Sequence, residues 1–454
     1  MSKLKVGYSQ LVANPPLGIG VAGYYIPRYA SGFIDDIEVS AMVLSLGDKE
    51  MALVAIDTLS IANNVIDEYK ALVQEKTRLD KDSVMLCASH THTGPLLTPT
   101  DRFEVDEEMI FNYKNYLGER IAEAVALAKA DQKETKVGYS VCPVPAKVAY
   151  IRRYKMKDGT TFTCPPINDQ NIDHAIGELD ERVNIVRFTR DGADDIVLLN
   201  YGVHADTTNG DKISADWPGW MRKTVEMALD GTRCMFFPGA EGDVGSTNVF
   251  PSGGDMNDTE ISFDNEMKSP GMARFVGRAM AGCVLQVYDK VNYVDVEDVN
   301  FINKVLKVKA NTPKKEEIPL AEKYVEYHLA GKDELIPFKA MQLTTVLAES
   351  YRILDLKDGP EYFDLRLTGV KIGPIALIGI AGEPFTEIGV KIQDIEGWDL
   401  IMPCALTNGS VGYFPNKSAY DEGGYEAKTS RFAPGVAETI IDGAKELLEE
   451  LKNS

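Results

Sequence analysis

The sequence predicts a mixed α/β fold, with α+β character, in one large domain that spans residues 1–454. Short apolar runs typical of buried strands alternate with longer segments of helical spacing along most of the chain. Hydrophobic residues make up 44% and charged residues 26% of the 454 residues, which is enough to bury a large core. The pattern contains no internal repeat and no low-complexity tract.

The first half of the chain opens with a predicted β-hairpin. Two β-rich runs, 37–48 and 50–60, meet at the turn formed by Gly47 and Asp48. Residues 61–77 have helical spacing and predict the helix that follows the hairpin. The further elements expected here are a buried strand at 83–90, a helix at 106–131, strands at 182–189 and 194–202, a helix at 217–230 and a buried strand at 233–237.

The second half begins with residues 251–269, which are polar, rich in Gly, Asp and Asn, and indicate a surface loop. The charged helical segment 313–355 is expected to be an insertion or cap. The other expected elements are a helix at 271–288, a strand at 298–310, strands at 363–371 and 374–380 around the turn at Gly373 and Pro374, a helix after Glu383, a strand at 400–405 and an amphipathic helix at 434–452.

The net charge of −21, from 48 basic and 69 acidic residues, repels phosphate backbones and anionic head groups. We therefore expect no nucleic-acid partner. No run of 18 apolar residues occurs, so no integral membrane contact is expected, and residues 1–16 lack the apolar core of a signal peptide. The six cysteines form no CxxC pair, which favours buried thiols in a soluble, cytoplasmic protein over a cysteine-based zinc site.

Histidine is scarce, with five in the chain, and two of them flank Thr91 directly after a predicted buried strand. Residues two apart on a strand face the same side, about 6.6 Å apart at Cα, so His90 and His92 would project into one cleft. One ring would bind a metal while the other contacts substrate, or both would bind one ion. The non-functional alternative is a pair of polar residues on a solvated strand end.

A second apolar strand, 198–204, ends in His204. Its neighbours Asp206 and Asp216 suit a metal ligand that is supported by carboxylates, and a capped strand end is the alternative. The glycine-rich run 236–248 allows the backbone to approach a ligand closely. It lacks the Gly-Lys-Ser/Thr ending of a phosphate-binding loop.

Four motifs in this order resemble the neutral, non-lysosomal ceramidase family. They are Thr-His-Thr-Gly-Pro around residue 92, Ser-Ala-Asp-Trp-Pro-Gly after the strand that ends in His204, Phe-Phe-Pro-Gly-Ala-Glu-Gly-Asp-Val at 236–244 and Ala-Gly-Glu-Pro-Phe-Thr at 381–386. A ladder with the family's spacing follows, formed by Asn408, Tyr413, Tyr420, Tyr425 and Glu426. Together the motifs cover residues 90 to 426, which is nearly the whole chain.

This resemblance implies a ceramidase-like catalytic domain with one zinc ion. The implied ligands are His90, His204, Glu383 and Tyr413, a set that leaves room for a water or a substrate oxygen. The resemblance also implies that His92 lies at the reacting carbonyl as a proton donor or oxyanion partner.

The remaining implied site residues are Arg152, which matches the family's arginine although its flanking residues differ, and Tyr425, which would line the pocket. Ceramidases have a catalytic serine directly after Gly-Asp-Val, whereas this chain has Gly245 there and Ser246 one position later. The nucleophile is therefore either Ser246 or a zinc-activated water, and we favour the water. The chain also has no room for the family's C-terminal immunoglobulin-like domain and no secretion signal, so a small soluble amide or ester is expected on equal terms with ceramide.

The prediction is a zinc-dependent hydrolase that cleaves an amide bond, such as an N-acyl bond, in a small-molecule or N-acyl substrate. One alternative is a catalytically silent member of the family that binds a ligand. Another is a TIM barrel of the amidohydrolase superfamily, which also uses His-x-His after a strand but needs two further metal-binding histidines and a late aspartate. The oligomeric state is not predicted.

Overall fold

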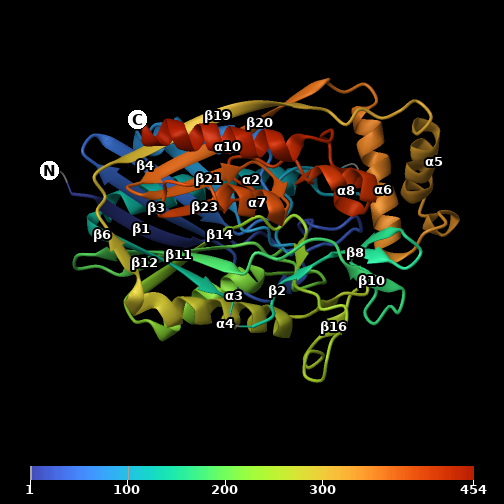
Figure 1. The fold of residues 1–454 in the computed structure, drawn as a ribbon, viewed down its shortest axis with the longest axis horizontal. Helices are drawn as coiled ribbons and strands as arrows, with labels where there is room; N and C mark the ends of the chain where they lie inside the picture. Colours follow the sequence, from blue (N-terminus) through green and yellow to red (C-terminus); the bar gives the residue numbers. More distant parts are fainter. Residues whose placement is uncertain (1–2, 101, 145) are drawn as a thin grey trace.

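The computed structural model describes residues 3–100, 102–144 and 146–454. It confirms the mixed α/β fold: a large and a small β-sheet pack face to face, and helices cover the outer face of each (Figure 1). Because the strands of both sheets are mostly antiparallel, the TIM-barrel alternative is wrong.

The large sheet has the order β14-β12-β11-β6-β1-β3-β4-β5, with β18 also paired to β6. Neighbours are antiparallel except for the pairs β12 with β14 and β4 with β5. The hairpin expected at 37–60 is present as β3 and β4, whereas β1 and the largely polar β6 were not predicted. The bounds are β1 (Lys5–Val12), β3 (Glu38–Leu46), β4 (Lys49–Ile56), β5 (Val84–Ala88), β6 (Lys133–Pro143), β11 (Arg182–Arg190), β12 (Asp195–Tyr201), β14 (Thr232–Pro238) and β18 (Asn292–Val294).

The small sheet has the order β19-β20-β21-β23, and its last pair is parallel. Its strands are β19 (Val299–Lys309), β20 (Tyr362–Ile372), β21 (Ile375–Ile380) and β23 (Leu400–Cys404), which match the predicted strands closely. The core between the sheets contains apolar side chains from both, for example Leu198 and Phe237 from the large sheet and Leu377 and Met402 from the small one. This shared core agrees with one domain over 1–454, which stays a prediction.

Helices close both outer faces (Figure 1). The outer face of the large sheet packs against α1 (Asn63–Thr77) and α2 (Glu107–Ala130) at one end and α3 (Asp216–Ala228) and α4 (Pro270–Val287) at the other. The small sheet packs against α7 (Thr386–Gln393) and α10 (Val436–Lys452). A Cβ at Gly369 of β20 would lie 2.8 Å from a methyl of Leu451, so glycine lets α10 lie close to the strand. No helix among the described residues is long and apolar enough to cross a membrane.

The segment 313–355 is helical, as predicted, and connects β19 to β20. It contains α5 (Ile318–Leu329) and α6 (Ala340–Leu356), which lie at one end of the molecule (Figure 1). Helix α6 packs against α9 (Tyr425–Thr429), and Arg352 donates from Nε to the Lys428 carbonyl at 2.7 Å. The insertion therefore contacts the helix that begins with a predicted site residue.

The remaining elements are short. They are β2 (Gly32–Phe33), β7 (Tyr150–Ile151), β8 (Arg153–Met156), β9 (Thr161–Thr163), β10 (Ile172–Ala175), β13 (Lys212–Ile213), β15 (Val244–Gly245), β16 (Glu260–Ile261), β17 (Met267–Lys268), β22 (Glu383–Pro384), β24 (Tyr413–Phe414), α8 (Lys417–Glu422) and three 3-10 turns, η1 (Lys81–Ser83), η2 (Tyr288–Lys290) and η3 (Asp333–Leu335).

The two edges of the large sheet approach each other, and this convergence positions the site. Strands β14 and β5 lie at opposite ends of the strand order yet contact one another. The segment after β23 bridges them: Ala405 N donates to the Pro238 carbonyl at 2.9 Å, and Ala88 N donates to the Leu406 carbonyl at 3.2 Å. The loops that leave β5, β12, β14 and the small sheet consequently meet in one place.

Candidate metal centre

His90 follows β5 and has a left-handed backbone, with φ of 68°, which only a few non-glycine residues adopt. Its Nδ1 lies 2.8 Å from the Leu59 carbonyl. Because a carbonyl can only accept, Nδ1 carries the proton, and in the neutral ring the lone pair of Nε2 faces the cleft. The side chain is buried, with 3% of the residue exposed. This is the tautomer and orientation of a metal-ligating histidine.

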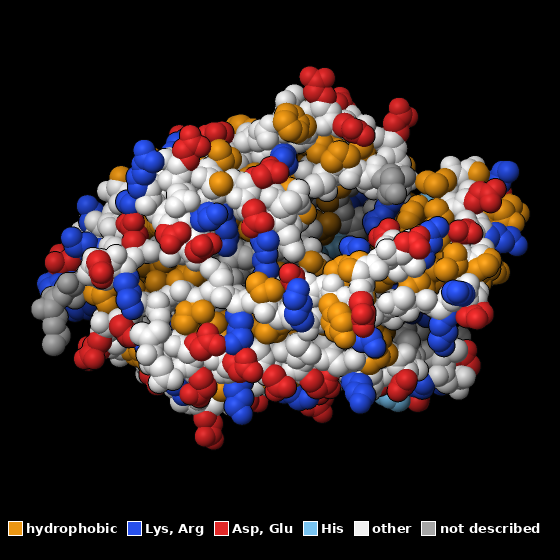
Figure 2. All heavy atoms as spheres, turned by 90° about the horizontal axis from the view of Figure 1, so that it is seen from above, with side chains coloured by type: hydrophobic (Ala, Val, Ile, Leu, Met, Phe, Trp, Pro, Cys, Tyr) orange, Lys and Arg blue, Asp and Glu red, His pale blue; other side chains and the backbone are white. Residues whose placement is uncertain are grey.

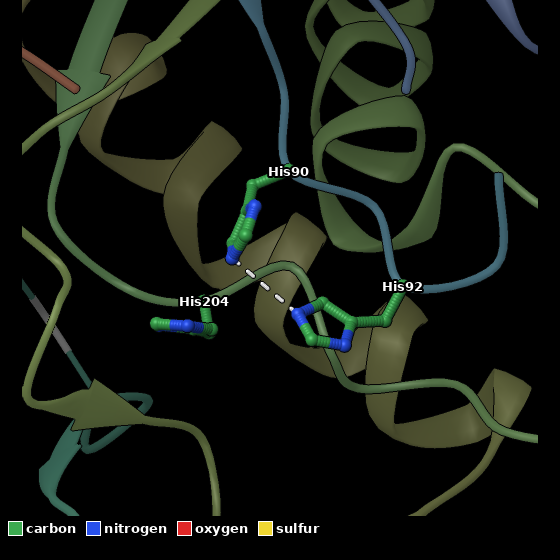
Figure 3. A group of neighbouring side chains, drawn as sticks. All are labelled: His90, His92 and His204. Atoms are coloured by element: carbon green, nitrogen blue, oxygen red, sulfur yellow. Dashed lines mark hydrogen bonds between the residues drawn. The ribbon is translucent and has the colours of Figure 1, made fainter. Parts of the chain in front are cut away.

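His204 follows β12 and is oriented in the same way. Its Nδ1 lies 2.9 Å from the Glu241 carbonyl and 3.0 Å from the Val244 carbonyl, which leaves Nε2 to face Glu383 Oε2 at 3.4 Å. Figure 3 shows the ring beside that of His90. The expectation that carboxylates support this ring is wrong. Asp216 instead accepts from the backbone and hydroxyl groups of Thr207 and Thr208, and so holds the loop that follows the histidine.

Glu383 and Tyr413 are neighbours because β22 and β24 pair in parallel with these two residues in register. The Glu383 Oε2 atom lies 3.3 Å from Nε2 of His90 and 3.4 Å from Nε2 of His204. The ring of Tyr413 stacks on that of His204 with centroids 6.5 Å apart. The structure therefore brings together all four residues that the sequence predicts as ligands.

His92 lies beside this group with its Nε2 3.4 Å from Nε2 of His90 (Figure 3). Its ring centroid is 5.8 Å from that of His204. Its other nitrogen, Nδ1, is buried without a hydrogen bond, 3.8 Å from Oδ2 of Asp206. The ring of His92 therefore lies next to the predicted ligands, with its Nε2 directed at the Nε2 atom of His90.

Burial and mutual charge set the protonation of these groups. Burial alone would lower the pKa of His90, yet the Glu383 carboxylate outweighs it and raises that pKa to about 9. The pKa of Glu383 lies well below its usual value, although burial opposes this, because His90 and His204 face it. Burial lowers the pKa of His204 to about 4, with Arg152 adding to the effect, and lowers that of His92 well below its usual value. At neutral pH the chain alone therefore has one imidazolium, one carboxylate and two neutral rings here.

Arg152 follows β7 and reaches the cluster through Tyr413. Its guanidinium lies over the Tyr413 ring at 5.4 Å, donates from Nε to Glu426 at 2.7 Å and donates to the Gly242 carbonyl at 2.9 Å. The ring of Tyr425 lies 5.7 Å from that of Tyr413. Both predicted residues thus lie beside the cluster, and Glu426 fixes the arginine.

Ser246 is not brought to the cluster by any hydrogen bond of the described chain. It lines a separate cavity of about 440 Å³ together with Tyr150 and Met267. Side chains alternate along a strand, and a Cβ at Gly245 would lie 3.7 Å from the Cβ of Arg152. Position 245 therefore faces the arginine.

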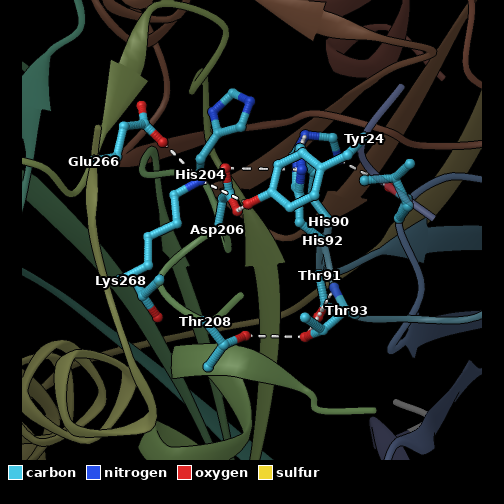
Figure 4. Close-up of polar contacts among 12 residues, drawn as sticks. Tyr24, His90, Thr91, His92, Thr93, His204, Asp206, Thr208, Glu266 and Lys268 are labelled. Carbon is cyan, nitrogen blue, oxygen red and sulfur yellow. Dashed lines mark hydrogen bonds and ion pairs between the residues drawn. The ribbon is translucent and has the colours of Figure 1, made fainter. Parts of the chain in front are cut away.

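A buried network of charges lies next to His92, and the sequence did not reveal it (Figure 4). Lys268 Nζ lies 2.6 Å from Asp206, 2.6 Å from Glu266 and 2.7 Å from the Tyr24 hydroxyl, which itself donates to Asp206 at 2.6 Å. Burial alone would lower the pKa of Lys268, but the two carboxylates raise it well above its usual value.

The prediction that residues 251–269 form a surface loop is therefore wrong for the last residues of this range. Lys268 is 1% exposed and Glu266 8%. A lysine in a polar stretch of sequence is expected to be exposed to solvent. Lys268 is buried because it contacts Tyr24 and Asp206, which are distant in the sequence. No local signal in the sequence indicates this.

Glu241 is a second residue that the sequence analysis missed. It lies in the glycine-rich run after β14, is fully buried at 0% exposed, and has a carboxylate oxygen within 4.8 Å of ligand atoms of His90 and Glu383. Burial raises its pKa to about 8. The signal was present in the sequence as the single charged side chain between Phe236 and Gly242.

A succession of aromatic side chains connects the cluster with α6. Tyr25 stacks on Tyr351 of α6 with centroids 6.3 Å apart, and the Arg102 guanidinium lies 4.3 Å from the Tyr25 centroid. Tyr25 also raises the pKa of Tyr425, after the larger effect of burial. Figure 2 shows a hollow with hydrophobic side chains on the face seen there, toward the α5–α6 end of the molecule.

The residues of this centre fit a divalent cation. Within the part of the chain that the structure describes, the His204 Nε2 atom, the Glu383 Oε2 atom and both carboxylate oxygens of Glu241 are buried without a hydrogen-bond partner. Two groups of three side chains have ligand atoms within 4.8 Å of one another, namely His90 with His92 and His204, and His90 with Glu241 and Glu383. Imidazole and carboxylate donors suit zinc and other first-row divalent ions, and a bound cation would partner the orphaned atoms.

Comparison with solved structures defines the class of fold: the chain has the fold of the neutral ceramidases. It is similar to the crystal structure of neutral ceramidase from Pseudomonas aeruginosa, with a TM-score of 0.72 over 99% of this chain and 75% of that one, at 16% sequence identity. It is also similar to a structure described as ceramidase complexed with C2, with a TM-score of 0.70 over 99% of this chain and 76% of that one, at 15% identity. No family model matches the sequence, and no curated protein matches it.

Proposed function

We propose that this protein is a zinc-dependent hydrolase that cleaves an amide bond in an N-acylated small molecule. The observation that carries the proposal is the buried convergence of His90, His204 and Glu383, in which Nε2 of His204 and Oε2 of Glu383 have no hydrogen-bond partner among the described residues. The fold shared with proteins named as ceramidases supports the same reaction class. His90, His204, Glu383 and Tyr413 would hold the ion.

When bound, the ion would polarise the scissile carbonyl and lower the pKa of an attacking water toward about 7. The chain's own residues would do the rest. His92 is neutral because its pKa is lowered, so its Nε2 can take a proton from the water and return it to the leaving amine. Arg152, fixed by Glu426, places a positive charge beside Tyr413 for the oxygen that becomes negative in the transition state.

The substrate class follows from the approach to the centre. Tyr25, half-buried and backed by the buried ring of Tyr351, offers apolar surface for an acyl chain, and Arg102 adds a positive charge over the Tyr25 ring. An N-acyl compound is therefore the first class to test, with ceramides among its members and small soluble amides as the alternative.

The test combines metal analysis with a hydrolysis screen. The protein is purified, its zinc content is measured, and the zinc-loaded form is assayed against N-acyl amino compounds, ceramides and small esters. We expect one zinc per chain and turnover of an amide that His92→Ala abolishes without releasing the metal. Zinc binding with no turnover of any class would support a ligand-binding protein, the alternative that Gly245 at the serine position favours. Absence of metal binding would contradict the proposal.

A further inference from the structure

Glu241 is held between the segments that supply two of the proposed ligands. Its own backbone carbonyl accepts the Nδ1 proton of His204 at 2.9 Å. The next residue, Gly242, donates to the Pro384 carbonyl at 2.9 Å, directly after Glu383. A Cβ at Gly242 would lie 2.6 Å from the Glu383 carbonyl oxygen, so only glycine lets the two segments approach this closely. The backbone of Glu241 is thus fixed relative to both ligands.

The carboxylate of Glu241 has no cation of its own in the described chain. Neither oxygen has a hydrogen-bond partner, and the residue is 0% exposed. Of the neighbouring cations, protonated His90 faces Glu383, and Arg152 uses its Nε for Glu426 and a terminal nitrogen for the Gly242 carbonyl. A buried carboxylate without a partner costs several kcal/mol. A cation bound beside Glu241 would remove this cost.

The distances between ligand atoms indicate where a cation beside Glu241 would bind. One oxygen of Glu241, one ring nitrogen of His90 and one oxygen of Glu383 all lie within 4.8 Å of one another. Two donors of one ion are at most about 4.4 Å apart when each bond is about 2.0–2.2 Å long. A small side-chain rotation would therefore bring all three atoms to the same ion.

We propose that Glu241 is a fifth protein ligand of the metal centre, in addition to His90, His204, Glu383 and Tyr413. This inference rests on the proposed metal centre and extends it. Two carboxylates would balance the charge of a divalent ion, and the added oxygen donor would widen the choice of metal toward manganese and iron.

The test measures metal affinity and needs no substrate. Metal-free full-length protein is titrated with Zn²⁺, and separately with Mn²⁺, in competition with a chromophoric chelator. Loss of a residue that merely supports a ligand weakens binding about 10–100-fold, so we expect Glu241→Gln to weaken Zn²⁺ binding about 100-fold or more, with one ion still bound. Glu241→Asp, which keeps the charge, should recover part of the loss. Glu226→Gln on α3, a partly buried glutamate remote from the cluster, is the matched control and should bind as the wild type does.

The outcomes separate this inference from the proposed function. If the wild type binds zinc, Glu383→Gln does not, and Glu241→Gln binds as tightly as the wild type, only the fifth ligand is wrong. If the wild type binds no zinc, the centre itself is wrong. If Glu241→Gln fails to fold, a crystal structure of the zinc-loaded wild type decides: a carboxylate oxygen of Glu241 more than about 3 Å from the ion would overturn the proposal.

Discussion

Two buried clusters of charged side chains lie side by side in this protein, and they differ in how their charges are balanced. In the network of Tyr24, Asp206, Glu266 and Lys268, the lysine contacts both carboxylates at 2.6 Å. In the metal centre, by contrast, the carboxylate oxygens of Glu241 and the Oε2 atom of Glu383 have no hydrogen-bond partner among the described residues, and the protonated His90 faces Glu383 alone at 3.3 Å. The lysine of the first cluster contacts both of its carboxylates directly, whereas the second cluster has two carboxyl groups beside one imidazolium, an arrangement that an added cation would stabilise.

The largest expected effect removes a ligand from the unbalanced cluster. Glu383→Gln should weaken Zn²⁺ binding about 1,000-fold or more, because Glu383 lies between both proposed histidine ligands. Competition titration of the metal-free protein measures this. The control is Glu387→Gln, on the exposed face of α7, where Glu387 pairs only with Lys391 and Asn416. If Glu383→Gln and Glu387→Gln bound Zn²⁺ with equal affinity, the cluster around Glu383 would not be a cation site, and the contrast between the two clusters would be wrong.

The second effect removes the cation from the balanced cluster. Lys268→Met should lower the free energy of unfolding by about 3–5 kcal/mol, since it leaves Asp206 and Glu266 buried without their partner. Denaturant unfolding of the metal-free protein measures it. Lys391→Met, whose side chain is 54% exposed, should change stability by less than about 0.5 kcal/mol. A tolerated Lys268→Met would mean that the network is hydrated rather than sealed.

The third effect is the pH dependence of metal binding. In the metal-free protein the pKa of His90 is raised to about 9, so below this pH its Nε2 carries a proton that the ion must displace. Apparent Zn²⁺ affinity should therefore rise about tenfold per pH unit from pH 6 to 9 and then level off. Zn²⁺ titrations across this pH range, with proton release measured in weakly buffered solution, test whether the affinity rises with pH. Affinity that falls as the pH rises would contradict the assignment of His90 as a ligand.

The smallest effect concerns the serine. Ser246→Ala should change the hydrolysis rate less than about twofold, because Ser246 lines a cavity whose walls include none of the cluster histidines. Steady-state kinetics on the substrate found in the screen measures it, with His92→Ala as the inactive reference. Loss of turnover in Ser246→Ala would show that the loop moves when substrate binds, and would restore the serine as the nucleophile.

The sequence predicted most elements of the fold because their periodicity is local. The hairpin β3–β4, the helix α10 and the buried strand β5 each have an unmistakable pattern of apolar residues. The strands β1 and β6 were missed because their charged and polar residues resemble loop sequence, and their pairing across the sheet is decided by tertiary contacts.

In the candidate site, too, the residues that local sequence patterns mark were predicted, and those that depend on tertiary contacts were not. His90, His204, Glu383 and Tyr413 were found by motif and spacing, and the structure brings them together. Lys268 was missed because its partner Asp206 lies 62 residues earlier in the chain. No local pattern reports which charged side chains fold against each other, so neither this network nor the support of His204 by backbone carbonyls could be predicted.

The bridge that the segment after β23 makes between β14 and β5 has a consequence for biosynthesis. The proposed ligands are spread from residue 90 to residue 413. A nascent polypeptide therefore has no complete set of them until residue 413 has left the ribosome. Metal uptake would then follow folding of the early segments, and cellular ion supply would set when the centre is filled.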